Sequence, residues 1–458
     1  MKTYDVRFWK ISKKKAGAAP YLVRWIVDGT VFPHHFTTMA LADSFRSELM
    51  QAARRGEAFD TETGLPESMT RSKNGVTWFE HACEYVDSRW DKVSGKQRIS
   101  IAETLTAVTP VLVRDKRGAP DPAVLRTALY RWAFNKQRRE GEKPPEVAAA
   151  LKWITKVSVP LADLAEYDTV TSALECCATK LDGKAAAPGY FSRRRRVLYN
   201  VLKYAVTKKR LREHPLVGLD WKAPETVCEE IDPAVVASPV QVRELLTAVS
   251  YSGWRRGPRL VAFYACMYYA MMRPGEVIAL REQDCDLPEQ GWGRLMLGNS
   301  RPTVGTEWTD DGQVQEARGL KGRPRKAKRP VPIPPELVTI LRRHIARYGT
   351  APDGRLFRTE RGGVLQASAY ARTWKAARHL ALTPTQVESE LARRPYDLRH
   401  AGVSLQLNAG IPATQVAEWA GHSVEVLLKI YAKCVDGHDH VWHSMVEHAL
   451  KGQESKGA

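Results

Sequence analysis

The spacing of apolar residues changes once along the chain, and this change constrains the fold more than any other feature. Residues 4–10 (YDVRFWK) and 21–27 (YLVRWIV) alternate apolar and polar side chains, as half-buried strands do. Asp28 and Gly29 are a hairpin-turn signal that leads into a third strand. From Trp78 onward the spacing becomes helical. The chain is therefore predicted to be mainly α-helical, with small β elements and a β-rich unit at its N-terminus.

The N-terminal unit, residues 1–66, is expected to combine a three-stranded sheet with one helix. Thr37 or Thr38 can cap a helix over residues 39–53. The loop after the first strand carries three consecutive lysines, Lys13, Lys14 and Lys15. A basic sheet with aromatic side chains can lie in a DNA groove, so this unit is interpreted as DNA-binding; the alternative is a plain accessory domain. Residues 57–75 hold few core residues, which predicts a linker.

Residues 78–221 follow the helical period, and a run of arginines is their most informative stretch. The residues Val197, Val201, Tyr204 and Ala205 share one face of a helix. Directly before them stand Arg193, Arg194, Arg195 and Arg196. A solvated helix face would also explain such a charge run. Consecutive arginines that lead an amphipathic helix nevertheless favour contact with phosphates.

The rest of the chain begins after a second predicted linker, the acidic and proline-bearing residues 222–240. It is helical apart from two strand-like segments, 292–297 and 329–334, with a basic run between them. We therefore expect three domains: a β-rich DNA-binding unit over residues 1–66, a helical DNA-binding domain over 70–225 and a mixed α/β domain over 236–458.

The balance of charge indicates a polyanionic partner. The 458 residues include 70 Lys and Arg against 51 Asp and Glu, which gives a formal net charge of +19 at pH 7. Each phosphate that a basic side chain neutralises releases condensed counterions, so such a chain binds nucleic acid readily. The alternative is a basic protein that is merely soluble.

Other classes of function are disfavoured by what the sequence lacks. No segment approaches the ~18 apolar residues that span a bilayer, and the N-terminus has no signal-peptide stretch, so a cytoplasmic, nucleoid-associated protein without membrane contact is expected. The seven cysteines are scattered without paired CxxC knuckles, which disfavours a structural zinc. No Walker-type phosphate-binding loop occurs. We expect no metal and no cofactor.

Four separated segments carry residues suited to chemistry on a phosphodiester. Arg273 follows a long apolar helix, and a basic run begins at Lys321. Residues 394–400 (RPYDLRH) open another helix. His422 ends the segment WAGH, and Tyr431 follows it nine residues later. Arginine forks, a histidine donor and a phenol nucleophile together provide what phosphoryl transfer requires.

Each segment alone also has an ordinary explanation. Arg273 would serve as a surface arginine, and His422 as a residue at a helix C-terminus. Tyr431 falls on an apolar stripe and would then be a core tyrosine. The expectation for Arg273 is that Pro274 and Gly275 break the preceding helix, with Glu276 close enough to orient the guanidinium.

Together and in this order, the segments resemble the catalytic domain of tyrosine recombinases, the phage integrase family, over roughly residues 240–435. Arg273 in MMRPGEVIAL corresponds to the first active-site arginine of the family, and Arg399 in PYDLRH corresponds to the second. His422 matches the Gly-His motif, and Tyr431 stands at the spacing of the nucleophile.

The resemblance leaves two assignments open. The lysine of the catalytic hairpin is best matched by Lys321, but Lys326 and Lys328 lie in the same loop. Most members have His-x-x-Arg in the second motif, whereas here Tyr396 holds the histidine position and His400 lies one helical turn further on. Tyr396 is assigned to the catalytic set with His400 as the alternative acid or base, although a phenol with a reference pKa of ~10 is a poorer base.

The resemblance implies an integrase of a mobile element, which cuts and rejoins DNA through a 3′-phosphotyrosyl intermediate without metal or nucleotide. In that mechanism Arg273 and Arg399 clamp the phosphate, His422 is a further donor, and Lys321 protonates the leaving 5′ oxygen. The implied partners are double-stranded DNA attachment sites, a homotetramer assembled on DNA and an excision factor. The first two domains resemble, less specifically, the arm-type and core-type DNA-binding domains of larger integrases.

Two other functions compete with recombination. A type IB topoisomerase shares the same chemistry, but the phage-type motifs and the β-rich unit favour an integrase. A catalytically silent DNA-binding protein descended from a recombinase would have no need to retain Arg273, Arg399, His422 and Tyr431.

Overall fold

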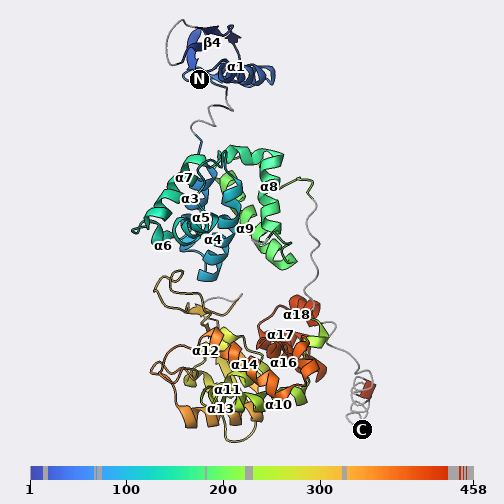
Figure 1. Ribbon diagram of the computed structural model, residues 1–458. Coiled ribbons are helices and arrows are strands. Elements are labelled where there is room, and N and C mark those ends of the chain that lie inside the picture. The colour runs from blue at the N-terminus through green and yellow to red at the C-terminus, as the bar shows by residue number, and fades with distance from the viewer. Residues whose placement is uncertain are drawn as a thin grey trace. The chain divides into compact units, whose positions relative to one another are not determined.

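The computed structural model describes residues 2–13, 19–66, 69, 75–180, 183–221, 231–321 and 327–431, together with residues 443, 444, 447 and 450. The chain forms two compact units, residues 1–226 and 227–458 (Figure 1). Several predictions fall outside the described residues, namely those for Lys14, Lys15, Lys326 and parts of the two linkers (67, 68, 70–74 and 222–230). The expected division into three domains stays a prediction.

The N-terminal sheet is built around strand β4 (Tyr21–Val27). This strand pairs along its length with β5 (Thr30–Phe36), and on its other side with β2 (Val6–Phe8) and β3 (Ser12–Lys13), all antiparallel. Asp28 and Gly29 form the predicted hairpin turn, with φ angles of 48° and 77°. The sheet has four strands instead of the expected three, because the first strand is interrupted after Phe8 and resumes at Ser12.

Helix α1 (Met39–Arg54) begins at the second of the two candidate caps. The side chain of Thr38 accepts a hydrogen bond from the backbone N–H of Leu41 at 3.3 Å. Thr38 therefore satisfies one of the N–H groups that the first helical turn leaves unpaired, and the prediction of a helix from Met39 is confirmed.

The core of the β-rich unit extends further along the chain than predicted. Trp25 and Leu49 pack with Phe59 and Leu65, which are 0% and 7% exposed. Phe59 lies in strand β6 (Phe59–Asp60), which pairs with β1 (Lys2–Thr3). The prediction of a linker from residue 57 was therefore wrong, because two well-spaced apolar side chains in a polar segment are enough to close this small core.

The remainder of the first unit is helical, as predicted. Its helices are α3 (Trp78–Trp90), α4 (Gly95–Val108), α5 (Pro122–Thr127), α6 (Lys136–Arg139), α7 (Pro145–Val157), α8 (Tyr167–Ala178) and α9 (Pro188–Thr207), with the short turns η1 (Thr109–Val111), η2 (Ala128–Ala133) and η3 (Leu161–Ala165). Capping boxes start two of them: Thr77 with Glu80 at α3, and Ser94 with Gln97 at α4.

The second unit surrounds a small sheet with helices. These are α10 (Pro239–Tyr251), α11 (Arg256–Tyr269), α12 (Pro274–Ala279), α13 (Pro335–Tyr348), α14 (Ala367–Ala381), α15 (Pro384–Glu388), α16 (Asp397–Asn408), α17 (Ala413–Ala420) and α18 (Val424–Tyr431), with η4 (Pro233–Val235) and η5 (Glu282–Asp284). The antiparallel sheet has the order β11 (Arg329–Ile333), β8 (Gly293–Leu297), β7 (Cys285–Asp286), and β9 (Asn299–Ser300) pairs with β10 (Arg318–Gly319). Both strand-like segments of the sequence are thus strands, and each is the other's partner.

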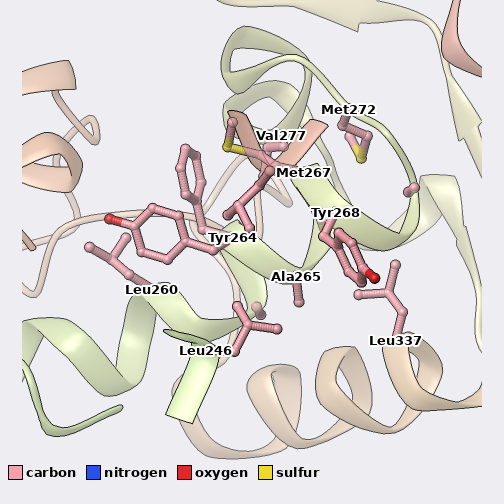
Figure 2. Packing of buried hydrophobic residues seen from close by; sticks show 14 of the residues in the cluster. Leu246, Leu260, Tyr264, Ala265, Met267, Tyr268, Met272, Val277 and Leu337 are labelled. Atoms are coloured by element: carbon pink, nitrogen blue, oxygen red, sulfur yellow. The ribbon is translucent and has the colours of Figure 1, made fainter. Parts of the chain in front are cut away.

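Helix α11 is the centre of this unit. It packs against α10, α13 and α16, and its side chains Leu260, Tyr264, Met267 and Tyr268 are buried (Figure 2). A helix that is covered on several sides has apolar residues around most of its circumference, which explains why this segment is so rich in aromatic and methionine side chains.

The turn after α11 differs from the prediction. The helix already ends at Tyr269, and Met271 adopts a positive φ of 50°. Pro274 does not simply end a helix, because it occupies the first position of α12, where the missing N–H of proline has no consequence. Arg273 consequently lies in the short connection between two helices, directly before α12.

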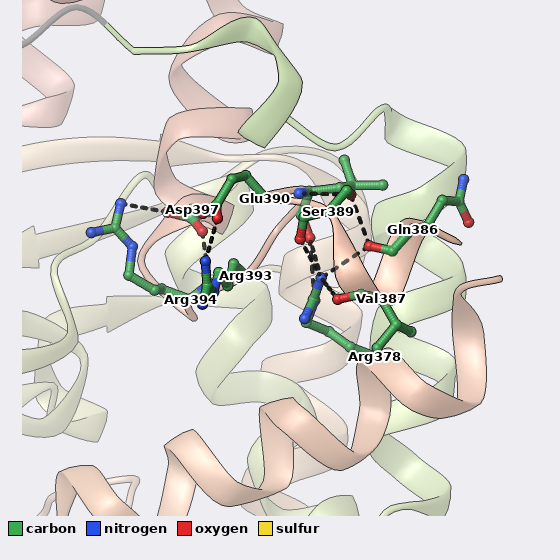
Figure 3. Close-up of polar contacts among 9 residues, drawn as sticks. Arg378, Gln386, Val387, Ser389, Glu390, Arg393, Arg394 and Asp397 are labelled. Atoms are coloured by element: carbon green, nitrogen blue, oxygen red, sulfur yellow. Dashed lines mark hydrogen bonds and ion pairs between the residues drawn. The ribbon is translucent and has the colours of Figure 1, made fainter. Parts of the chain in front are cut away.

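A buried arginine anchors the loop that leads into α16. Arg378, on α14, is 6% exposed, and its Nη2 lies within hydrogen-bonding distance, 2.9–3.3 Å, of the carbonyls of Gln386, Val387, Ser389 and Leu391 (Figure 3). Further along the same loop, the carboxylate of Asp397 accepts from the backbone N–H of Arg394 at 2.7 Å. The contacts of Arg378 hold the loop against α14, and the bond between Arg394 and Asp397 closes the turn at the start of α16.

Three features concern the described residues as a whole. None of their helices combines the length and the apolar character needed to cross a membrane. Among them, no three His, Cys, Asp or Glu side chains gather closely enough to hold a metal ion. The cysteines that the structure describes are free thiols: Cys83, Cys176, Cys177, Cys266 and Cys285.

Candidate active site

Four of the residues predicted to be catalytic meet where α16, α17 and α18 approach the turn between α11 and α12. The three helices lie together in the second unit (Figure 1). Arg273 comes from the turn and Arg399 from the first turn of α16, whereas His422 follows α17 and Tyr431 ends α18. A hydrogen bond joins Arg399 to His422, the ring of His422 contacts that of Tyr431, and Arg273 binds the backbone carbonyl of Gly421 beside His422.

Arg273 is oriented by Glu276, as the sequence predicted. Its Nη1 donates to Oε1 of Glu276 at 3.0 Å, and its backbone N–H donates to Oε2 at 2.9 Å. Its Nη2 donates to the carbonyl of Gly421 at 2.8 Å. Burial alone would raise the pKa of Glu276, but the surrounding guanidinium groups outweigh burial and hold this pKa at about 2. The carboxylate is therefore ionised and keeps Arg273 in place.

Arg399 is the most deeply buried residue of the site, at 0% exposed. Its Nη1 donates to the carbonyl of Met271, and its Nη2 donates to the carbonyl of Ala420 at 2.6 Å. The same Nη2 lies 2.8 Å from Nε2 of His422. Burial, followed by the charge of Arg273, lowers the pKa of Arg399 to about 10. The guanidinium thus remains a cation at neutral pH.

The contact with Arg399 defines the tautomer of His422. A guanidinium can only donate, so Nε2 of the histidine accepts, and the neutral ring carries its hydrogen on Nδ1. Burial, together with the charges of Arg399 and Arg273, lowers the pKa of His422 to about 3, so the ring is neutral near pH 7.

Three N–H groups of this cluster have no hydrogen-bond partner. Within the described part of the chain, these are Nδ1 of His422, Nε of Arg399 and Nε of Arg329, and all three are buried. Buried polar groups without partners are rare in native proteins, because each costs the free energy of its lost hydration. The site therefore has spare donors for an acceptor that the chain itself does not supply.

The hydroxyl group of Tyr431 lies 2.9 Å from Nδ1 of His400. The aromatic ring of Tyr431, which is 1% exposed, also stacks on the ring of His422 with 6.2 Å between the centroids. Tyr396 packs edge-on against His400, with 5.1 Å between the ring centroids. Of the two residues left open by the sequence, His400 has the ring nitrogen within hydrogen-bonding distance of the tyrosine.

His400 is neutral under ordinary conditions. Burial, followed by the charges of Arg399 and Arg394, lowers the pKa of His400 to about 4. A neutral imidazole has one ring nitrogen that accepts, so Nδ1 can accept the hydrogen of the Tyr431 hydroxyl.

The assignment of the catalytic lysine stays a prediction. Lys321 and Lys328 are both exposed and flank the basic segment between β10 and β11, whereas Lys326 lies outside the described residues. Lys321 remains our assignment on the resemblance alone.

Sequence reasoning missed one residue of the cluster, Arg329 at the start of β11. This side chain is 1% exposed, and its Nη1 and Nη2 donate to the two carboxylate oxygens of Glu276 at 3.3 and 2.8 Å. Burial alternates along β11, where Arg329, Val331 and Ile333 face inward. The alternation of buried and exposed positions along this predicted strand was therefore a usable signal, but Arg329 also ends a basic run, so its charge was not assigned to the interior.

The residues predicted to contact DNA lie in the first unit. On α9, Arg193, Arg195 and Arg196 are exposed, but Arg194 is 5% exposed and donates to the carbonyls of Cys176 and Thr179 and to the Tyr190 hydroxyl. Arg194 therefore joins α9 to α8 inside the protein. Lys13 is exposed at the end of β3. Contact of the exposed arginines and of Lys13 with phosphates stays a prediction.

Curated relatives of the chain are phage proteins. No family model matches it. The integrase of Mycobacterium phage D29 is 24% identical over 338 residues, which cover 69% of this chain and 76% of the relative. The integrase of Mycobacterium phage L5 is 23% identical over 385 residues, which cover 81% of this chain and 91% of the relative.

Solved structures with a similar arrangement were also found. The Tn1549 transposon integrase in complex with a circular intermediate DNA has a TM-score of 0.47 at 16% identity, over 71% of this chain and 99% of that one. A lambda integrase dimer bound to a core site has a TM-score of 0.47 at 13% identity, over 94% of this chain and 95% of that one. In the order and spacing of its four motifs and in its mycobacteriophage relatives, this chain is similar to the tyrosine recombinase, or phage integrase, family.

Proposed function

We propose that the chain is an integrase, a site-specific recombinase that cuts and rejoins double-stranded DNA through a 3′-phosphotyrosyl intermediate. The observation that supports the proposal most strongly is a tyrosine hydroxyl beside a cationic cluster in which Arg399 and His422 each have a buried N–H group without a hydrogen-bond partner. A phosphodiester has one negative charge shared by two non-bridging oxygens, and this is the acceptor that such a cluster lacks. The names of the phage relatives support the same function.

The arginines would meet the charge of the scissile phosphate. Nη1 and Nη2 of Arg273 each direct a hydrogen to the protein, toward Glu276 and Gly421, and a guanidinium has five N–H groups in all. The remaining N–H groups of Arg273, Nε of Arg399 and Nδ1 of His422 would bind the non-bridging oxygens. These donors are already oriented by the protein, so their alignment costs little as charge develops in the transition state.

Tyr431 would attack the phosphorus through its phenolic oxygen. The new phosphorus–oxygen bond forms while the bond to the 5′ oxygen breaks, which leaves a 3′-phosphotyrosine and a free 5′ hydroxyl. The phenolic proton passes to His400, and Lys321 supplies the proton that the 5′ oxygen takes up. A bound phosphate anion offsets the charge of Arg399, which is one cause of the low pKa of His400, and so makes this imidazole a better base.

Cleavage also requires the site to open. Tyr431 and Arg399 are 1% and 0% exposed, so a duplex cannot reach the phenolic oxygen while α18 keeps this position. Leu427 and Tyr431 are the side chains of α18 that are buried, and a displacement of this short helix would expose the hydroxyl. The DNA-free chain would thereby keep its nucleophile away from solvent.

Variants of Tyr396 and His400 should assign the acid–base role. His400→Ala is expected to lower the cleavage rate by ~10²–10⁴-fold, the usual contribution of a general acid or base. Tyr396→Phe should cleave at close to the unaltered rate, because the ring that packs against His400 remains. Single-turnover cleavage of a nicked duplex measures both. If Tyr396→Phe loses activity and His400→Ala does not, the role belongs to Tyr396.

Recombination itself can be separated from the two competing functions. Plasmids that carry the DNA on either side of the chain's own coding sequence are incubated with the protein, and exchange of flanking markers is scored. We expect recombinant products, and no relaxation of a supercoiled plasmid without such a site. Relaxation of any supercoiled plasmid would indicate a topoisomerase, and tight binding without strand cleavage would indicate a silent DNA-binding protein.

Removal of residues 1–66 should separate cleavage from full recombination. The β-rich unit has its own core, and we propose that it binds DNA sites distant from the crossover within a homotetramer that an excision factor regulates. The truncated chain is expected to cleave short core-site duplexes normally but to recombine full attachment sites poorly. Its footprint on flanking DNA should disappear, and the salt dependence of flank binding should weaken with the phosphate contacts removed. Identical flanking footprints for both chains would assign this unit another role.

A further inference from the structure

We infer that Arg329 is a positioning residue for DNA cleavage, which holds Glu276 and the turn at Gly421 so that Arg273 and His422 can meet the scissile phosphate. The inference rests on the proposed function and extends it to a residue outside the four motifs. Arg329 does not reach solvent, at 1% exposed, so it acts on the reaction only through its neighbours.

The first neighbour is the carboxylate of Glu276, which Arg329 shares with Arg273. Arg329 donates to both oxygens, whereas Arg273 donates to Oε1 through Nη1 and to Oε2 through its backbone N–H. A buried carboxylate must have its oxygens hydrogen-bonded. Without Arg329, the Arg273 guanidinium would be drawn onto both oxygens and would lose N–H groups that the phosphate needs.

The second neighbour is Gly421, the left-handed residue that ends α17 with a φ of 68°. A Cβ at this position would overlap Nη1 of Arg329 and would lie 3.3 Å from Nη1 of Arg273. The guanidinium of Arg329 therefore packs directly against the backbone of the turn. This same turn supplies the carbonyl that Arg273 binds and is followed at once by His422.

Stability alone gives a poor reason for an arginine at this position. A buried ion pair must offset the lost hydration of both charges, and apolar side chains often replace such pairs without loss of stability. β11 continues inward with Val331 and Ile333, so an apolar residue would suit the strand. An apolar residue, however, cannot share with Arg273 the task of donating hydrogen bonds to the carboxylate of Glu276.

The test compares cleavage of two nicked duplexes, one with an ordinary scissile phosphate and one with a methylphosphonate, which has no negative charge. Arg273 should contribute strongly to the cleavage rate when the scissile group is a charged phosphate, and much less when it is a neutral methylphosphonate. Arg329→Met is expected to slow cleavage of ordinary DNA on the order of 10²-fold, the usual effect of a small misplacement at an active site. On the methylphosphonate, its defect should shrink to under about tenfold, in parallel with that of Arg273→Met.

Two further variants keep the test decisive. Arg355→Met removes another largely buried arginine of the same unit, which is paired with Asp353 at 2.6 Å, and it should give the same relative rate on both substrates. Arg329→Lys keeps the positive charge but loses the second nitrogen that donates to Glu276. It should show the same dependence on the substrate, with a smaller loss of cleavage rate. This variant replaces Arg329→Met in the test if Arg329→Met does not fold.

The outcomes distinguish this inference from the function on which it rests. Normal cleavage by both Arg329 variants, or equal defects on the two substrates, would overturn the positioning role while leaving the recombinase intact. Absence of cleavage by the unaltered chain would overturn the proposed function and this inference with it.

Discussion

A chain in which lysine replaces Arg399 is expected to cleave DNA ~10²–10³-fold more slowly than the unaltered chain, which is the usual loss when one donor to a transition-state oxyanion is removed. Arg399 makes three hydrogen bonds through two nitrogens, to Met271, Ala420 and His422. An ammonium group is a single point charge and cannot span these acceptors while it also contacts a phosphate. Binding of DNA should change little, because its free energy is spread over many phosphates.

Single-turnover cleavage of a nicked core-site duplex measures this defect, and a gel-shift titration at fixed salt measures binding. Arg393→Lys is a suitable control, because this arginine is exposed and pairs only with Glu390 among the ion pairs of the described residues. Arg273→Lys should resemble Arg399→Lys. Near-normal cleavage by both site variants would show that the two arginines do not contact the scissile phosphate.

The second large effect is expected for Tyr431→Phe, which should form no covalent complex with DNA at all. The substitution removes the attacking oxygen and leaves the buried ring in place. The lost hydrogen bond to His400 should cost about 1 kcal/mol of folding stability, so the variant should remain folded and bind DNA. Denaturing gels of the protein incubated with a labelled nicked duplex measure the adduct.

Tyr264→Phe controls for the loss of a hydroxyl group elsewhere in the same unit. This tyrosine is also buried, at 0% exposed, and its hydroxyl donates to the carbonyl of Tyr370. We expect Tyr264→Phe to form the adduct at the normal level. An adduct that persists in Tyr431→Phe would mean that another residue is the nucleophile.

Local sequence signals predicted those parts of the fold that local chemistry determines. The hairpin over residues 21–36 follows from alternation and from Asp28 and Gly29, and the start of α1 follows from the cap residue Thr38. The same reasoning failed at Pro274, because proline both ends helices and begins them, and the choice depends on how the chain packs afterwards.

The site required more than local signals. Motif order predicted Arg273, Arg399, His422 and Tyr431 as site residues, but the pairing of Tyr431 with His400 depends on how α18 packs against α16, which no local pattern encodes. The same holds for Arg194, which belongs to a run of four arginines although its guanidinium points into the protein. A run of charged residues is visible in the sequence, but the packing of the helix decides which of these residues face solvent.

The decisive measurement is the identity of the residue that becomes covalently attached to DNA. The unaltered protein is trapped on a nicked duplex that loses its 5′ fragment after cleavage, and the adduct is digested and sequenced by mass spectrometry. We predict a single modified residue, Tyr431, joined to the 3′ phosphate of the cleaved strand. An adduct on any other residue, a 5′ linkage, or intact DNA in a stable complex would contradict it.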